Sequence, residues 1–391
     1  MDGAFESGAR HRRVLTRDNA LAIDALAGFL PLGARDCLAE TLSGAEIDTL
    51  THLAQSGTSP NSLRALASDL AYLDAWAQAS TDAPLVWPAS EATILRFIAH
   101  HLWDEEERRR NPAHGMPQAV AAALRASGRL RSTGPHAPTT VRRRLALWAS
   151  LHRRRGLKGP FGNPAIRNAL RLAIRAADRP PARKSPAAIT RDILDRLVAT
   201  CGRARAVDLR DRALLLLAFG SGGRRRSEIS RLRVEDLEER EPVPANASLP
   251  QGERLPVLAI RLRRTKTSST EAGESVLVIG RPVDALRAWL KFSKIGAGPV
   301  FRAIDQWGNL GAGALAPQSV NAMIKRRCAA AGLDPRRFSA HGLRSGYLTE
   351  AARAGVPLLE AMQQSRHRSL LQAARYYNEA EITRGRAARL A

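Results

Sequence analysis

The 391-residue sequence has few cysteines and no long apolar run. Its three cysteines, Cys37, Cys201 and Cys328, are far apart and match no metal-ligand spacing, so we expect reduced thiols rather than a metal site. No uncharged apolar run approaches the ~18 residues that cross a bilayer, and the first residues lack the apolar segment of a signal peptide. These absences predict a cytoplasmic protein without a membrane segment.

Acidic residues are also scarce relative to basic ones. The 61 lysines and arginines outnumber 37 aspartates and glutamates, which gives a formal net charge of +24. Codon preference in a GC-rich genome would explain a shortage of lysine, but it does not explain the excess of bases over acids. Such a balance is typical of nucleic-acid-binding proteins. The length favours more than one domain, since single cores rarely grow beyond about 250–300 residues.

Helical patterns dominate the first half of the chain. Ser43 and Glu46 fit a capping box that opens a short helix. A second helix is expected to begin at Pro60, because proline is favoured at the first helical position and leucines follow at three- and four-residue steps. Thr139 is expected to cap a later helix that carries a run of arginines.

Arginines gather on this later helix and on the one that follows it. An isolated charge run is ordinarily a solvated helix face. Here Arg167, Arg171 and Arg175 follow the first cluster at four-residue steps, which favours one continuous basic surface that contacts phosphates. The predicted DNA contacts are Arg142, Arg143, Arg144, Arg153, Arg154, Arg155, Arg167 and Arg171.

The pattern changes after Pro180, Pro181 and Pro186, which interrupt helical periodicity. Beyond them, helical patterns flank two period-two stretches, 257–264 and 275–280, which predict a β-hairpin with a long loop. The second half is therefore expected to be mostly α with a small antiparallel sheet. The predicted regions are a helical preface of unknown role (1–57), a helical domain (58–178), a linker (179–188) and a mixed domain with a C-terminal tail (189–391).

Four short motifs follow one another in the mixed domain. They are GGRRRSEI, RRTKTSS, SAHGLRSG and SRHRS, and the histidine of the last precedes a tyrosine by nine residues. Any one of their polar side chains would ordinarily be a surface charge in so basic a chain. Their ordered combination predicts a site for phosphodiester chemistry. The predicted catalytic residues are Arg225, Lys266, His341, Arg344, His367 and Tyr376.

Each residue type in these motifs suits that chemistry. A phosphodiester resists nucleophiles because its non-bridging oxygens are negative, so two arginines that neutralise this charge matter more than one strong base. His341 and Arg344 lie three residues apart on a predicted helix and can converge on one phosphate. Lys266, in the predicted hairpin loop, is placed to protonate a departing hydroxyl. His367 is suited to donate to a non-bridging oxygen or to position the nucleophile.

The sequence offers only four tyrosines as nucleophiles. Tyr72 belongs to the N-terminal helices, and Tyr347 lies on the predicted helix of His341, where packing is the simpler role. Tyr376 and Tyr377 remain. An unperturbed phenol has a pKa of about 10, so attack at neutral pH needs nearby cations and a proton acceptor, which the motifs supply. Covalent attachment to tyrosine would conserve the bond energy for rejoining.

The ordered motifs resemble those of the tyrosine recombinase, or phage integrase, family. The catalytic resemblance spans residues 186–391, and the helical region 59–180 is similar to the family's core-binding domain. The resemblance implies a mainly α fold with a small antiparallel β-sheet in the catalytic domain. It also implies that the core-binding and catalytic domains form a C-shaped clamp around duplex DNA.

The resemblance further implies a role for each catalytic residue. Tyr376, nine residues after His367, would form a 3′-phosphotyrosyl bond while the two arginines hold the scissile phosphate. Lys266 would be the general acid for the 5′ hydroxyl, and the two histidines would assist proton transfer and phosphate binding. No metal, nucleotide or other cofactor is required by this chemistry.

Three positions depart from the family's usual residues. Arg224 stands where an aliphatic residue usually precedes the first catalytic arginine. Arg366 stands where glycine usually precedes the last histidine, and Ser345 follows the second arginine where the family often has histidine or arginine. Within the run of three arginines, the spacing to Glu228 favours Arg225 as the catalytic one.

The resemblance also implies the partners. They are double-stranded DNA in the nucleoid and further copies of the chain, as a dimer on each recombination site and a tetramer across two. Accessory DNA-bending proteins could assist, and the segment after the tyrosine would pack on a neighbouring subunit. The leading hypothesis is a site-specific recombinase. A type IB topoisomerase, which relaxes DNA as a monomer, and a non-catalytic DNA-binding protein of the same fold are the alternatives.

Overall fold

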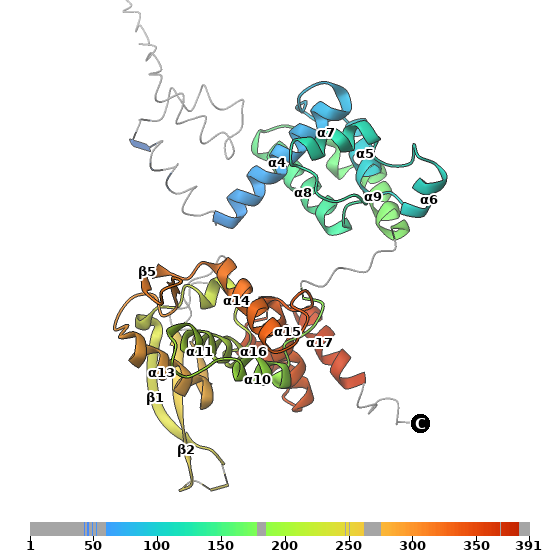
Figure 1. Cartoon of the computed structure of the whole chain (residues 1–391). Coiled ribbons are helices and arrows are strands. Elements are labelled where there is room, and N and C mark those ends of the chain that lie inside the picture. Colours follow the sequence, from blue (N-terminus) through green and yellow to red (C-terminus); the bar gives the residue numbers. More distant parts are fainter. Residues whose placement is uncertain are drawn as a thin grey trace, which may run out of the picture. The chain divides into compact units, whose positions relative to one another are not determined.

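A computed structural model gives the fold of the chain in two compact units, Met1–Pro181 and Ala182–Ala391 (Figure 1). It describes residues 43, 45, 46, 49, 52, 60–177, 185–246, 248, 249, 251–261, 275–367 and 369–382. Both units are predominantly helical, and the described strands form two small antiparallel sheets, which confirms the predicted fold class. None of the described helices is long and apolar enough to cross a membrane.

The first unit is a helical domain. Its core contains Trp76, Phe97, Leu124 and Trp148, whose side chains are fully buried. These residues come from four different helices, so burying their large apolar surface joins the helices into one domain. The described elements are α4 (Pro60–Thr81), α5 (Glu91–His101), α6 (Glu105–Arg110), α7 (Gln118–Ala126), α8 (Pro138–Arg154), the 3₁₀ turn η2 (Pro160–Gly162) and α9 (Pro164–Ala176) (Figure 1).

Helix starts in this region test three expectations. The capping box is confirmed, because Ser43 N donates to Glu46 Oε2 at 2.7 Å and Glu46 N donates to Ser43 Oγ at 3.4 Å. Pro60 is the first residue of α4, as predicted. The prediction for Thr139 is wrong, since α8 already begins at Pro138. Backbone N–H groups in the first turn of a helix have no partner within the helix. Proline has no N–H and therefore suits the first helical position, which Pro138 occupies.

The second unit packs helices against a three-stranded sheet. Its core includes Leu214 and Leu217 of α11, Trp289 of α13 and Ile324 of α14, all fully buried. The described elements are α10 (Arg191–Ala199), α11 (Ala206–Gly220), α12 (Arg226–Ile229), η3 (Val234–Asp236), β1 (Leu237–Pro244), β2 (Arg254–Arg261), β3 (Ser275–Ile279), α13 (Arg281–Ser293), β4 (Arg302–Ile304), β5 (Leu310–Ala314), α14 (Pro317–Ala330), α15 (Ala340–Arg353), α16 (Leu358–Ser365) and α17 (Leu370–Ile382).

The predicted hairpin is confirmed as β2 and β3. These strands pair antiparallel, with Leu258 opposite Val278, and β1 pairs antiparallel with the other edge of β2. Val276 and Val278 are buried whereas Leu277 and Ile279 are exposed, the alternation expected of a sheet with one face on the core. A second, two-stranded sheet is formed by β4 and β5.

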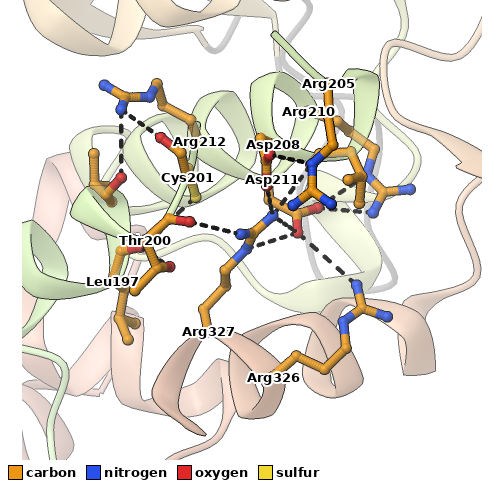
Figure 2. Close-up of polar contacts among 12 residues, drawn as sticks. Leu197, Thr200, Cys201, Arg205, Asp208, Arg210, Asp211, Arg212, Arg326 and Arg327 are labelled. Carbon is orange, nitrogen blue, oxygen red and sulfur yellow. Dashed lines mark hydrogen bonds and ion pairs between the residues drawn. The ribbon is translucent and has the colours of Figure 1, made fainter. Parts of the chain in front are cut away.

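A buried ion-pair network ties α10, α11 and α14 together (Figure 2). Arg327 of α14 donates from Nε and Nη2 to Asp211 Oδ2 at 3.0 Å and 2.7 Å, and from Nη2 to Asp208 Oδ1 at 2.8 Å. Its Nη1 donates to the Thr200 carbonyl at the end of α10 at 3.0 Å. Arg210 binds the other oxygen of Asp211 at 2.7 Å. Both carboxylates are thus neutralised inside the unit, as buried charges require.

Candidate active site

Two glycines allow the predicted site residues to come together. Gly222 and Gly223, in the turn after α11, have φ of +90° and +71°, which side chains rarely adopt. A Cβ on Gly223 would lie 2.3 Å from Arg344 Cα of α15, and one on Gly222 would lie 2.4 Å from the Gln364 carbonyl oxygen of α16. The turn therefore packs directly on both helices. This packing brings Arg225, which follows the turn, to the residues of α15.

The buried Arg344 and the half-buried His367 contact each other in the cluster. Arg344 Nε donates to His367 Nε2 at 3.0 Å, and Arg344 Nη1 donates to the Gly223 carbonyl at 3.3 Å. His367 Nδ1 lies 2.8 Å from Ser365 Oγ. Burial, and then the charges of Arg344 and Arg225, lower the pKa of His367 to about 3. The imidazole is therefore neutral at pH 7.

The site carries an excess of positive charge. Burial, and then the charges of Arg225 and Arg224, lower the pKa of Arg344 to about 10, while Glu228 and Tyr376 act in the opposite direction. Arg344 keeps its charge at neutral pH. The positive charges of Arg224 and Arg225, which lower the pKa of Arg344, favour the binding of an anion at this site.

The three consecutive arginines have different surroundings. Arg225 is the N-cap of α12, and its side chain is 58% exposed while Nη1 donates to Glu228 Oε1 at 2.7 Å. Arg226 is exposed. Arg224 is buried, and its Nη2 donates to the Gln364 carbonyl at 2.6 Å. Of the three, Arg225 is the one that combines access for a ligand with electrostatic coupling to the arginine of α15.

Tyr376 and Tyr377 of α17 point in different directions, because successive residues of a helix are about 100° apart. Tyr376 OH lies 3.4 Å from Nε2 of His341 on α15. Tyr377 is 5% exposed, and its OH donates to the Val356 carbonyl at 3.1 Å. The geometry places Tyr376 at the cluster and Tyr377 in a small core between α15, α16 and α17.

The other two tyrosines are engaged elsewhere. Tyr72 is buried in the first unit, where its OH lies 2.7 Å from His101 Nε2 and burial raises its pKa to about 12. Tyr347 packs edge-on against Phe219, with ring centroids 6.0 Å apart, and burial raises its pKa. Of the tyrosines, Tyr376 alone has its hydroxyl at the cluster.

Lys266 lies outside the described residues. The last described residue before it is Arg261, the end of β2, and the next after it is Ser275, the start of β3. Its role as general acid stays a prediction. Within the part of the chain that the structure describes, no three His, Cys, Asp or Glu side chains are grouped so that they could hold a metal ion.

The predicted DNA-contacting arginines of the first unit differ in exposure. Arg154 and Arg155 are half-buried, and the Arg155 guanidinium lies 3.9 Å from the ring centroid of Trp87. Arg171 Nη2 donates to Asn168 Oδ1 at 2.8 Å. The exposed ones are Arg142, Arg143, Arg153, Arg167 and Arg171.

Arg144 is a correction to the predicted DNA contacts. Its side chain is 11% exposed and ion-paired with the buried Asp69 at 3.4 Å. The guanidinium carbon lies 3.3 Å from the ring centroid of Tyr72, and Nη1 donates to His136 Nδ1 at 3.3 Å. Arg143 also pairs with Asp69, but it is exposed. Arg144 therefore stabilises the interior of the unit and is not available to a phosphate.

Two residues that support the site were missed by the sequence reasoning. Ser365 is fully buried beside His367, and Gln364 donates from Nε2 to the carbonyls of Leu277 and Gly220 at 2.7 Å and 3.0 Å. A hydroxyl two residues before His367 was a usable signal for Ser365. The contacts of Gln364 join segments far apart in sequence, so no local pattern marks them.

No protein-family model matches the chain, but individual relatives and solved structures do. A relative named integrase/recombinase XerD homolog, from Selenomonas ruminantium, is 32% identical over 253 residues, which are 62% of this chain and 69% of that protein. Similar solved structures include a lambda integrase dimer bound to a COC′ core site, at 15% identity, coverage of 85% of this chain and 75% of that chain, and a TM-score of 0.45. Another is the Tn1549 transposon integrase with circular intermediate DNA, at 14% identity, coverage of 82% and 99%, and a TM-score of 0.43.

By its likeness to the XerD homolog, the chain belongs to the integrase/recombinase family of tyrosine recombinases. It is therefore an enzyme that cleaves and rejoins DNA strands. The topoisomerase alternative receives no support from these relatives.

Proposed function

We propose that the chain is a site-specific recombinase in which Tyr376 forms a 3′-phosphotyrosyl bond. Tyr376 Oη attacks the scissile phosphorus and its proton passes to His341 Nε2. The bond between phosphorus and the 5′ oxygen breaks, and Lys266 supplies the proton that this oxygen takes up. Attack by the 5′ hydroxyl of another strand reverses these steps and releases the tyrosine.

The observation that carries this proposal is the distance of 3.4 Å between Tyr376 OH and His341 Nε2, one helical turn from Arg344 on α15. The phenol then has a proton acceptor beside it, and the phosphate has two guanidinium groups. Arg344 and Arg225 would hold the non-bridging oxygens, where negative charge grows during attack.

The remaining parts of the proposal concern DNA binding and assembly. Residues 58–178 would act as the core-binding domain and residues 189–391 as the catalytic domain, joined by the linker 179–188. The exposed arginines of α8 and α9 would contact phosphates of duplex DNA. A dimer on each site, a tetramer across two sites and help from DNA-bending proteins are the assembly we propose, in the cytoplasm where such DNA lies.

The test uses a DNA substrate with a nick near the cleavage point, after cleavage sites have been mapped on the DNA that flanks the gene. Release of the short fragment prevents rejoining, so a covalent protein–DNA adduct accumulates and is seen as a shifted band in a denaturing gel. Wild type is expected to form the adduct, and Tyr376→Phe is expected to abolish it.

Tyr377→Phe is the matched control. It removes one hydroxyl from the neighbouring residue, which donates to the Val356 carbonyl rather than facing His341, and should retain the adduct. The proposal fails if wild type forms no adduct on a cleaved site, or if Tyr376→Phe still forms one while Tyr377→Phe does not.

A further inference from the structure

Ser365 is a buried hydroxyl at the end of α16, directly beside the catalytic histidine. It has no exposed surface, and its Oγ lies 2.8 Å from His367 Nδ1. The end of this helix is held in place from two sides. Arg224 Nη2 donates to the Gln364 carbonyl at 2.6 Å, and the Gln364 side chain donates to Leu277 of β3 at 2.7 Å. Ser365 thus has a fixed position from which to act on the imidazole.

The contacts of His367 define which ring nitrogen carries its proton. The Arg344 Nε–H can only donate, so His367 Nε2, at 3.0 Å, has to accept. An imidazole that accepts at Nε2 is neutral and carries its hydrogen on Nδ1. That hydrogen then faces Ser365 Oγ and is donated to it. The chain Ser365, His367 and Arg344 therefore has one consistent direction of donation.

We propose that Ser365 is a positioning residue, which fixes the Nδ1–H tautomer of His367 so that Nε2 orients the Arg344 guanidinium. This inference rests on the proposed function, in which Arg344 binds the scissile phosphate. It differs from one of the two roles expected from the sequence, because a neutral His367 that donates its Nδ1–H to Ser365 Oγ has no other N–H to give to a phosphate oxygen.

The proposal also determines which N–H groups of Arg344 remain available to bind the phosphate. Its Nε–H is committed to His367, and one Nη1 hydrogen is committed to the Gly223 carbonyl. The guanidinium has five N–H donors, so three remain, all on the Nη edge. Two adjacent oxygens of the phosphate would bind that edge as a bidentate pair, the geometry in which arginine is most selective.

Loss of the Ser365 hydroxyl would weaken the hydrogen bonds that hold His367 and Arg344 in place. The Nδ1–H form would lose its acceptor, and the alternative Nε2–H form would set one donor against the Nε–H donor of Arg344. Either outcome costs a hydrogen bond in a buried place and moves Arg344 from its position. Loss of the hydroxyl is therefore expected to lower the rate of the chemical step rather than the affinity for DNA.

The direct experiment observes the tautomer by NMR. The full chain is labelled with ¹⁵N-histidine, the His367 signals are assigned by their loss in His367→Gln, and the spectra are recorded at neutral pH without DNA. We expect a protonated Nδ1 and an unprotonated Nε2. A protonated Nε2 in the wild type would overturn the proposal. Since this readout involves no cleavage, it is independent of whether Tyr376 is the nucleophile.

A kinetic comparison then tests the consequence. Ser365→Ala should slow adduct formation on the nicked substrate roughly tenfold at saturating protein, as loss of a group that orients a histidine does at other sites. The matched control is Ser221→Ala, since Ser221 is also fully buried nearby but binds only the Leu217 and Ala218 carbonyls. An unchanged rate in Ser365→Ala, or an equal loss in Ser221→Ala, would refute the positioning role. If Ser365→Ala does not fold, the wild-type spectrum decides.

Discussion

Arg142 and Arg144 lie two residues apart on α8 but have opposite surroundings. Arg142 is exposed, whereas Arg144 is packed between Asp69, Tyr72 and His136. Successive helical residues turn by about 100°, so consecutive arginines of one helix point in different directions. Variants at the two positions therefore distinguish the DNA binding proposed for Arg142 from a contribution of Arg144 to stability.

We predict that Arg144→Ala lowers the free energy of unfolding by about 1–3 kcal/mol, because a buried carboxylate and an imidazole each lose a donor. Arg142→Ala should change stability by less than about 0.5 kcal/mol and weaken DNA binding instead. Urea denaturation and a salt titration of DNA affinity measure the two effects. Equal stability of both variants, with equal loss of DNA affinity, would contradict the assignment.

The helix shared by the candidate residues His341 and Arg344 could be predicted from the sequence, but the partners of these side chains could not. The three-residue spacing of His341 and Arg344 predicts a shared helix face, and both lie on α15. The inward turn of Arg144 had a visible signal, since it lies three residues after Val141 and four before Trp148, both buried. The contact between Ser365 and His367 was marked only by their two-residue spacing, and its role depends on where Arg344 lies, which no local pattern reveals.

Arg327 forms the buried ion pairs that join α14 to α11. It binds Asp208 and Asp211, of which Asp211 is fully buried, while the neighbouring Arg326 is 63% exposed and 3.9 Å from Asp211 (Figure 2). Removal of one partner from a buried ion pair leaves a charge without compensation, whereas an exposed pair contributes little.

Arg327→Ala is therefore expected to destabilise the chain by about 3–5 kcal/mol, and Arg326→Ala by about 0–1 kcal/mol. Thermal and urea unfolding of the two variants provide the measurement. A similar, small loss for both would show that the network does not hold α14 in place.

Among the helices and strands, those with a regular spacing of apolar residues could be predicted from the sequence. Strands β2 and β3 are rich in β-branched and other apolar residues on either side of a polar loop, and both were expected. Strand β1, LEEREPVP, was missed because its exposed glutamates and Arg240 hide the alternation, although it pairs with β2. The short strands β4 and β5 contain alanine and glycine rather than β-branched residues, so only tertiary pairing defines them.

On the scale of the whole molecule, buried histidines make stability depend on pH. Burial lowers the pKa of His100 and His136 to about 4, and it lowers that of His101 as well. An unfolded histidine takes up a proton near pH 6.5, so the unfolded state binds more protons between that pH and about 4. Stability is thus fully present above pH 6.5 and is lost as the pH falls.

We predict a lower free energy of unfolding at pH 5 than at pH 7, with each fully buried histidine contributing at most about 1.4 kcal/mol per pH unit. Urea denaturation followed by intrinsic fluorescence measures it. His136→Asn keeps an acceptor for Arg144 without a titrating group, and it should reduce the pH dependence. Equal stability of the wild type at both pH values would argue against buried, neutral histidines.

The central claim is that Tyr376 forms the covalent bond to DNA. Mass spectrometry of the adduct tests this claim most directly. Trypsin releases the peptide YYNEAEITR, which begins at Tyr376 and holds both neighbouring tyrosines. After nuclease trimming of the trapped DNA, fragmentation of this peptide locates the phosphate. We predict a phosphodiester on the first tyrosine of the peptide. Attachment to the second tyrosine, or to any residue outside this peptide, would contradict the account.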